Sequence, residues 1–185
     1  RVLPNMTVVV PCDAIEAKKA TINVASIQGP CYLRFAREAT PVFTKEEDFF
    51  QVGKANILEE GSDLSIIACG PIVYESLLAA EKLKQEGISV RVINMHTIKP
   101  LDEEAILKAA SETGAIVTAE EHQIYGGLGG AVAEFLAKNN PTPIEMIGVK
   151  DSFGESGTPE ELAVKYELTA KDIGAAAKKV LSRKK

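Results

Sequence analysis

The sequence predicts an α/β protein with a three-layer αβα domain, in which helices cover both faces of a mainly parallel sheet. From residue 52 onward, short apolar runs alternate with segments of helical periodicity. One of these runs, Leu64–Cys69, is apolar except at Ser65, which is typical of a strand that is covered on both faces. Gly70-Pro71 then leads into a helix that is apolar along one side. Strands joined by helices imply right-handed crossovers and parallel neighbours.

A β-α-β piece is predicted in front of this domain. The residues Thr7–Val10 form a predicted strand, and Asp13 followed by Glu16 has the spacing of a capping box at a helix start. That helix runs to Val24, and Cys31–Phe35 is a second strand. The piece has too little apolar surface to fold alone. We therefore expect it to be the end of a second α/β domain that lies mostly upstream of Arg1.

The character of the chain changes between the two parts. The segment 38–51, EATPVFTKEEDFFQ, is charged, contains a proline and has no sustained period, so it is interpreted as a linker. The predicted organisation is therefore residues 1–37, a linker at 38–51, and the αβα domain at 52–185.

The remaining elements of the domain follow from the same periodicities. We expect a short strand at Ala55–Glu59, placed at an edge. We expect further strands at Ile88–Asn94, Ala115–Ala119 and Ile144–Val149. We expect helices at Glu103–Ser111 with Asp102 as N-cap, from the opening Gly126–Gly130 to Ala137, at Pro159–Tyr166, and at Ala170–Leu181 with Thr169 as N-cap and Asp172 completing a capping box.

Composition excludes some classes of partner. The 21 basic residues are outnumbered by 26 acidic ones, the net charge is −5, and the basic residues form no stripe, so nucleic acid is not an expected partner. No stretch approaches the length of a membrane span, so no membrane is expected either. The three cysteines Cys12, Cys31 and Cys69 have no metal-binding or redox spacing, which favours buried thiols in a reducing, cytoplasmic location.

Four features could carry chemistry, and each has a structural alternative. The run Gly126–Gly130 follows a strand and opens a helix, where an anion could bind, although close packing or a tight turn explains glycines equally. Glu120-Glu121-His122 lies at a strand's carboxyl end and could hold a base and its orienting partner, or be polar residues at a loop mouth. His96 also follows a strand end, where a lone histidine is usually structural.

Arg34 and Arg37 form the fourth feature, at the end of the strand Cys31–Phe35 and just past it. Two guanidinium groups three residues apart beside a linker could clamp an anion such as a phosphate. The alternative is an ion pair with the acidic cluster Glu46-Glu47-Asp48.

Several stretches together resemble the transketolase family of thiamine-diphosphate enzymes. The stretches PNMTVVVPCDAIEAKKA and GPCYLRFAR are similar to the end of its pyrimidine-binding domain. Those similar to its carboxyl-terminal domain are VINMHTIKPLDEEAI, IVTAEEH, GGLGGAVAEFL and DSFGESGTPEELAVKYELT. The resemblance implies transfer of a two-carbon ketol unit between sugar phosphates. Deoxyxylulose-phosphate synthase and the beta subunits of 2-oxo-acid dehydrogenases share some of these stretches and remain alternatives, as does a non-catalytic assembly or anion-binding module.

The resemblance assigns one role to a residue of this chain: Arg37 aligns with an arginine that contacts the substrate's phosphate. It implies thiamine diphosphate and magnesium in the complete enzyme, an amino-terminal portion or subunit as partner, and a homodimer. The family's cofactor-activating glutamate and diphosphate-binding domain have no counterpart here. We therefore expect no catalytic, cofactor or metal residue in residues 1–185, no cofactor bound to them, and no activity of this piece alone.

Overall fold

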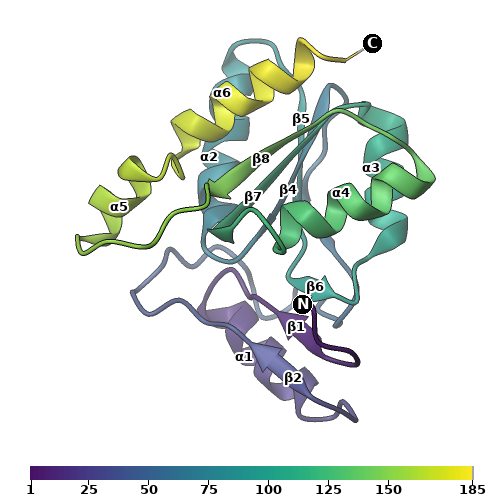
Figure 1. Cartoon of the computed structure of the whole chain (residues 1–185), viewed down its shortest axis with the longest axis vertical. Helices are drawn as coiled ribbons and strands as arrows, with labels where there is room; N and C mark the ends of the chain where they lie inside the picture. Colours follow the sequence, from purple (N-terminus) through teal and green to yellow (C-terminus); the bar gives the residue numbers. More distant parts are fainter. Residues whose placement is uncertain (185) are drawn as a thin grey trace.

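A computed structural model describes residues 1–184. These residues form a five-stranded and a three-stranded sheet with their helices (Figure 1). The larger sheet and its helices make the upper part of the view in Figure 1, and the smaller sheet lies below them with the N-terminus beside it. The predicted α/β class is confirmed.

The larger sheet has the strand order β3-β5-β4-β7-β8. The central strand β4 is parallel to β5 and β7, and β7 is parallel to β8. Strand β3 lies at one edge and is antiparallel to β5, so the predicted edge position is confirmed. The strands are β3 (Asn56–Glu59), β4 (Leu64–Cys69), β5 (Val90–Asn94), β7 (Ile116–Gln123) and β8 (Ile144–Val149).

Two pairs of helices cover the two faces of this sheet. Helices α2 (Ile72–Gln85) and α6 (Ala170–Leu181) lie on one face, and α3 (Glu103–Thr113) and α4 (Leu128–Asn139) on the other. Side chains of a strand alternate between faces, and in β4 Ile66 belongs to the core under α2 and α6 while Ile67 belongs to the core under α3 and α4. Helix α5 (Pro159–Lys165) has no buried residue and lies outside the layers.

The helix N-caps confirm the sequence signals. The Asp102 carboxylate accepts a hydrogen bond from the Ala105 N–H at 3.2 Å. Thr169 and Asp172 form the predicted capping box of α6. A further capping box that was not predicted, between Thr158 and Glu161, opens α5.

The smaller sheet joins the front of the chain to the αβα domain. Its order is β2-β1-β6, with β1 (Thr7–Val9) parallel to β2 (Cys31–Leu33) and antiparallel to β6 (Thr97–Lys99), and α1 (Ala14–Val24) connects β1 to β2. Strand β6 was not predicted, because three residues before a proline are too short to show a period and their partner lies at the other end of the chain. Val8, Val10 and Ile98 extend the core under α3 and α4.

Two of the predicted strand ends that differ from the structure matter for the site. Strand β2 ends at Leu33 and not at Phe35, so Arg34 begins a loop. Strand β7 continues past Ala119 to Gln123, because Gln123 still pairs with Val149 of β8 beyond a shift in register. Glu120, Glu121 and His122 therefore belong to the strand itself.

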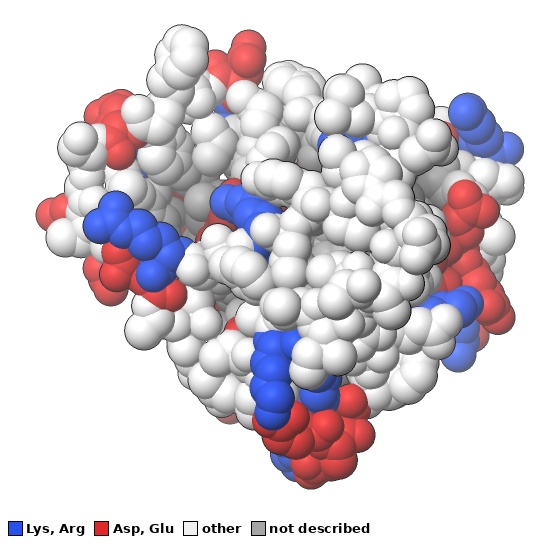
Figure 2. Space-filling model, turned by 90° about the horizontal axis from the view of Figure 1, so that it is seen from below, with Lys and Arg blue, Asp and Glu red and all other residues white. Residues whose placement is uncertain are grey.

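The face with the smaller sheet is seen from below in Figure 2, where basic and acidic side chains lie side by side in small groups around a largely uncharged surface. Among residues 1–184, no helix has the length and apolarity to cross a bilayer.

Candidate functional site

Arg37 lies on an exposed loop, residues 35–42, which we call the junction loop. Its side chain is 95% exposed, and its ion pair with Glu38 has an Nε–Oε1 distance of 3.5 Å. A surface pair of this kind contributes only about 0–1 kcal/mol, so the guanidinium is free to meet a ligand at little cost. The junction loop borders a cavity of about 140 Å³ at the start of α1, with Ala36 and Glu38 in its lining.

The far end of the junction loop is fastened by Asp13. Its carboxylate accepts hydrogen bonds from the Thr44 N–H and hydroxyl, both at 2.7 Å, and from the Phe43 N–H at 3.0 Å. It also caps α1 by accepting from the Glu16 N–H at 2.9 Å, as predicted. Burial raises the pKa of Asp13, but these four hydrogen bonds outweigh burial and hold the pKa below its ordinary value.

Glu16 does not complete the predicted capping box with Asp13. Its carboxylate accepts from the Cys12 N–H at 2.7 Å and from the Asn94 side-chain amide at 2.7 Å. Glu16 is buried, and burial raises its pKa more than these hydrogen bonds lower it. Glu16 thus joins α1 to the end of β5, which spacing along the sequence could not reveal.

Arg34 holds the near end of the junction loop. Its backbone N–H donates to the Val9 carbonyl at 3.0 Å, and its Nη2 donates to the Glu121 carbonyl of β7 at 2.8 Å. It also lines a cavity of about 80 Å³ together with Glu120 and His122. Arg34 and Arg37 therefore have different partners, and the structure does not show them joined in one anion clamp.

The acidic cluster Glu46-Glu47-Asp48 does not pair with either arginine. Glu46 pairs with Lys18 at 2.8 Å, and the Asp48 carbonyl accepts from Lys19 Nζ at 2.8 Å. The alternative explanation of the arginines by this cluster is therefore wrong, because the cluster packs beside α1 instead.

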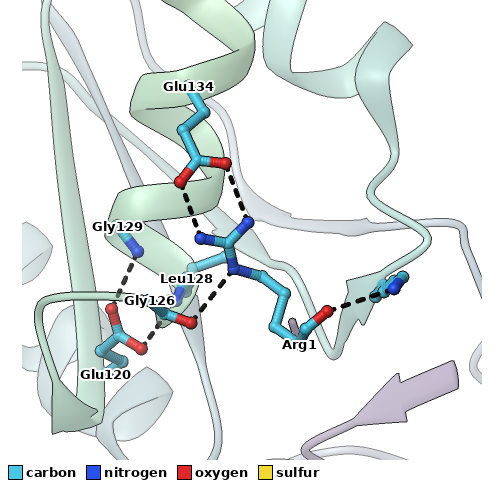
Figure 3. A network of polar contacts seen from close by, with 7 residues as sticks. Arg1, Glu120, Gly126, Leu128, Gly129 and Glu134 are labelled. Carbon is cyan, nitrogen blue, oxygen red and sulfur yellow. Dashed lines mark hydrogen bonds and ion pairs between the residues drawn. The ribbon is translucent and has the colours of Figure 1, made fainter. Parts of the chain in front are cut away.

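Glu120 occupies the amide groups that the glycine run presents. Its carboxylate accepts from the Leu128 N–H at 2.7 Å and from the Gly129 N–H at 2.8 Å, at the start of α4 (Figure 3). A Cβ at Gly127 would lie 2.0 Å from Glu120 Oε2, so Gly127 is needed for this close approach. The packing interpretation of Gly126–Gly130 is supported, because an external anion would have to displace a buried carboxylate.

Arg1 reaches the same turn from the other side. It donates to both carboxylate oxygens of Glu134 at 2.9 and 2.8 Å and to the Gly126 carbonyl at 3.1 Å (Figure 3). The turn is thus held by contacts from β7, α4 and the start of the described chain.

The other two members of the Glu120-Glu121-His122 group differ in environment. Burial raises the pKa of Glu121, and attraction to Arg34 opposes that rise. His122 is half exposed and its Nδ1 lies 2.8 Å from the Gln123 carbonyl. The Cys69 thiol lines the same cavity as Glu120 and His122, but burial raises its pKa and keeps it protonated. This fits the interpretation of the group as polar residues at a loop mouth.

His96 is a buried structural residue. Its ring stacks on Phe50 with centroids 4.2 Å apart, and its Nδ1 lies 2.9 Å from the Thr97 hydroxyl. Burial lowers its pKa to about 4, with attraction to Asp102 opposing. Of the three free cysteines, Cys12 and Cys69 are buried as predicted, while Cys31 is half-buried. Burial raises the pKa of the Cys12 and Cys69 thiols far above the ordinary value.

Within residues 1–184, no group of three or more His, Cys, Asp or Glu side chains lies together in a way that could hold a metal ion. What the site can do chemically is present one guanidinium, that of Arg37, on a loop fixed at both ends.

Comparisons with known proteins identify the family. The model of the transketolase C-terminal domain matches residues 53–173. The chain is 46% identical over 184 residues to a 6-deoxy-6-sulfo-D-fructose transketolase subunit of Clostridium sp. (strain MSTE9), which covers 100% of this chain and 57% of that protein. It is 38% identical over 188 residues to 1-deoxy-D-xylulose-5-phosphate synthase 1 of Geobacter sulfurreducens, covering 100% of this chain and 30% of that protein.

A solved structure shows the same fold. The protein described as "Split gene transketolase, inactive beta4 tetramer" superposes with a TM-score of 0.97 at 45% identity, covering 100% of this chain and 61% of that one. This chain therefore spans little more than half the length of its subunit-type relatives. The resemblance carried by the stretches from PNMTVVV to KYELT is confirmed. On the family match, the identities and the shared fold, this chain belongs to the transketolase family and contains its C-terminal domain.

Proposed function

We propose that this chain is the C-terminal portion of a transketolase that transfers a two-carbon ketol unit between sugar phosphates. The observation that carries the proposal is Arg37, a 95% exposed guanidinium on a loop that is anchored at both ends. A guanidinium in that setting suits a terminal phosphate, because its planar set of N–H groups can donate two parallel hydrogen bonds to an anion.

The proposal assigns the cofactor to another part of the enzyme. Thiamine diphosphate supplies the carbanion stabilisation of ketol transfer, and a second portion or subunit holds it with magnesium. Residues 1–184 contain no group of three or more His, Cys, Asp or Glu side chains that could hold a metal ion, and the proposal assigns no step through the cofactor to them. Their part is to bind the substrate's charged end and to support assembly.

The partner in this proposal is an amino-terminal transketolase portion, as a separate subunit or on the same polypeptide. The relatives named as a transketolase subunit and as a split-gene transketolase support the separate arrangement. Residues 1–37 then end the pyrimidine-binding domain, 38–51 are the linker and 52–185 are the C-terminal domain, which agrees with a family match that begins at residue 53. We also propose pairing of two such assemblies as a homodimer, and a cytoplasmic location consistent with three free thiols.

The nature of the anion is a separate question. The Clostridium relative is named for a sulfo sugar, and a sulfonate resembles a phosphate in being a tetrahedral group with several acceptor oxygens. We propose phosphate as the group that Arg37 recognises, because the family resemblance of Arg37 is to a phosphate contact.

The test uses the chain combined with its amino-terminal portion, thiamine diphosphate and magnesium. Ketol transfer from a ketose phosphate is measured with a phosphorylated aldose and with its unphosphorylated counterpart. We expect transfer by the mixture and none by this chain alone. Arg37→Ala should lower kcat/KM for the phosphorylated acceptor by about 10- to 150-fold, the equivalent of a charged hydrogen bond of about 1.5–3 kcal/mol. Equal losses with both acceptors would contradict the role of Arg37.

The synthase and dehydrogenase alternatives predict different products. The identity to a deoxyxylulose-phosphate synthase is 38%, against 46% to the transketolase subunit. Decarboxylation of pyruvate by the mixture, with no ketol transfer, would favour those alternatives. The alternative of an anion-binding module placed the anion at Gly126–Gly130. The structure argues against that site, because the Glu120 carboxylate already accepts from the N–H groups of Leu128 and Gly129.

A further inference from the structure

We propose that Arg34 is a positioning residue for Arg37: by tying the start of the junction loop to β7, it sets where Arg37 meets the anionic end of the substrate. This inference rests on the proposed function, and it adds a role for the C-terminal domain in substrate binding. It concerns the contact between Arg34 and the backbone of Glu121, and not a second contact to the ligand.

The contact bridges two parts of the fold. Arg34 follows β2 in the smaller sheet, and its Nη2 donates to the Glu121 carbonyl of β7 in the larger sheet at 2.8 Å. Its own backbone N–H is bound to the Val9 carbonyl of β1 at 3.0 Å. The side chain is half-buried in a cavity that Glu120 and Cys69 also line. The residue that directly precedes the junction loop is therefore fixed to two sheets at once.

The other end of the loop is fixed independently. Asp13 holds Phe43 and Thr44 through three hydrogen bonds of 2.7 to 3.0 Å. The Phe43 ring also packs against Tyr74 of α2, with centroids 5.8 Å apart. Residues 35–42 therefore span two fixed points.

Along the chain, Arg37 is nearer to Arg34 than to Phe43, the first residue that Asp13 holds. Phe35, between the two arginines, is 51% exposed, so packing there is incomplete. The position of Arg37 consequently depends most on Arg34. Losing the Arg34 side chain leaves the loop attached through the Arg34 backbone and Asp13, so the loop shifts without unfolding.

Electrostatics favours an arginine at this place. Glu121 is half-buried near Arg34, and their attraction opposes the effect of burial on the Glu121 pKa. Arg34 thus satisfies a backbone carbonyl and stabilises a neighbouring carboxylate. The Nη2 group of Arg34 is thereby engaged within the fold.

The experiment is a double-mutant cycle in the complete enzyme, comprising wild type, Arg34→Ala, Arg37→Ala and the double variant. KM and kcat are measured for a phosphorylated aldose and its unphosphorylated counterpart. Because a misplacement of about 1 Å can cost 10²-fold, we expect Arg34→Ala to raise KM for the phosphorylated acceptor by about 5- to 20-fold. We expect kcat for the phosphorylated acceptor to be unchanged, and likewise both constants for the unphosphorylated acceptor.

The decisive outcome is non-additivity. If Arg34 acts through Arg37, the double variant loses no more kcat/KM for the phosphorylated acceptor than Arg37→Ala alone. Additive losses, or an equal loss with both acceptors, would overturn the inference while leaving the role of Arg37 intact. A failure of Arg37→Ala to discriminate between acceptors would instead overturn the proposed function, so the two failures are distinguishable.

Lys18→Ala serves as the matched control. Lys18 is a cation near segment 38–51, is 61% exposed and pairs only with the exposed Glu46 among the described residues. Its removal should leave KM and kcat unchanged for both acceptors. If Arg34→Ala does not assemble with its partner portion, Arg34→Lys replaces it in the cycle under the same additivity criterion.

Discussion

Asp13→Ala should release the linker from α1 and lower the stability of the chain. The substitution removes four accepted hydrogen bonds, from the Glu16 N–H at 2.9 Å, the Phe43 N–H at 3.0 Å, and the N–H and hydroxyl of Thr44 at 2.7 Å each. An N-cap contributes about 0.5–2 kcal/mol, and a hydrogen bond to a charged group about 1.5–3 kcal/mol. Because the four bonds share one carboxylate, their contributions are not additive. We expect a loss of about 3 kcal/mol in the free energy of unfolding.

Urea unfolding of the 185-residue chain at neutral pH measures this loss, and Asp48→Ala is the matched control. Asp48 lies in the same linker, but its carboxylate accepts from the Lys45 N–H at 2.8 Å and makes no comparable clamp. The control should change the free energy of unfolding by less than about 0.5 kcal/mol. A loss below about 1 kcal/mol for Asp13→Ala, or an equal loss for both variants, would refute the clamp.

The same clamp predicts a dependence on pH. Four accepted hydrogen bonds hold the folded pKa of Asp13 below the ordinary value of an aspartate. A carboxylate with a lowered folded pKa contributes stability above its unfolded pKa, and that stability is lost as the pH falls through the folded pKa. The difference between wild type and Asp13→Ala should therefore be full at pH 7 and shrink below pH 3.8. A difference that grows in acid would contradict the sign of the shift.

Three further predictions test other parts of the fold. Gly127→Ala should lower the free energy of unfolding by about 2 kcal/mol or more, because the new Cβ would lie 2.0 Å from Glu120. Gly130→Ala, whose Cβ would have its nearest contact at 3.6 Å, should be neutral or stabilising by up to about 1 kcal/mol. Equal losses of unfolding free energy for the two variants in urea would contradict this prediction. His96, with a folded pKa of about 4, stays neutral while the unfolded residue binds a proton, so stability falls as the pH drops from 6.5 towards 4. His96→Phe should remove about 2 kcal/mol of that loss at pH 4.5, and an unchanged acid slope would exclude this origin. Native trypsin digestion should cut first after Arg37, which is 95% exposed, and a first cut within 64–83 would show that the domain is not the stable unit.

Features fixed by local chemistry could be predicted from the sequence. The all-buried strand Leu64–Cys69 and the N-caps Asp102 and Thr169 depend on residues a few positions apart, and the structure has all of them. The exposure of Arg37 beside the linker was not derivable, because it follows from the path of the junction loop. Strand β6 was missed because its only pattern is three residues long.

The contacts that build the site were missed for a different reason. Arg34 binds a backbone carbonyl of β7, 87 residues away. Every residue offers a backbone carbonyl of this kind, so no side-chain signal marks it. Glu120 was seen as a candidate base, but its partners are the N–H groups of Leu128 and Gly129, eight and nine residues later. The glycine run was the available signal, since only a residue without Cβ admits the carboxylate there.

The buried carboxylates at the junction explain why its geometry is specific. Glu16 is 2% exposed and Glu120 is 1% exposed, and burying an unpaired charge is costly. Each accepts two hydrogen bonds from fixed donors, so any sliding of α1 or α4 would leave a buried carboxylate unsatisfied. An apolar contact of the same area could slide and repack at much lower cost. The front of the chain is therefore held to β5 in one register through Glu16, and this fixes the base from which Arg37 projects.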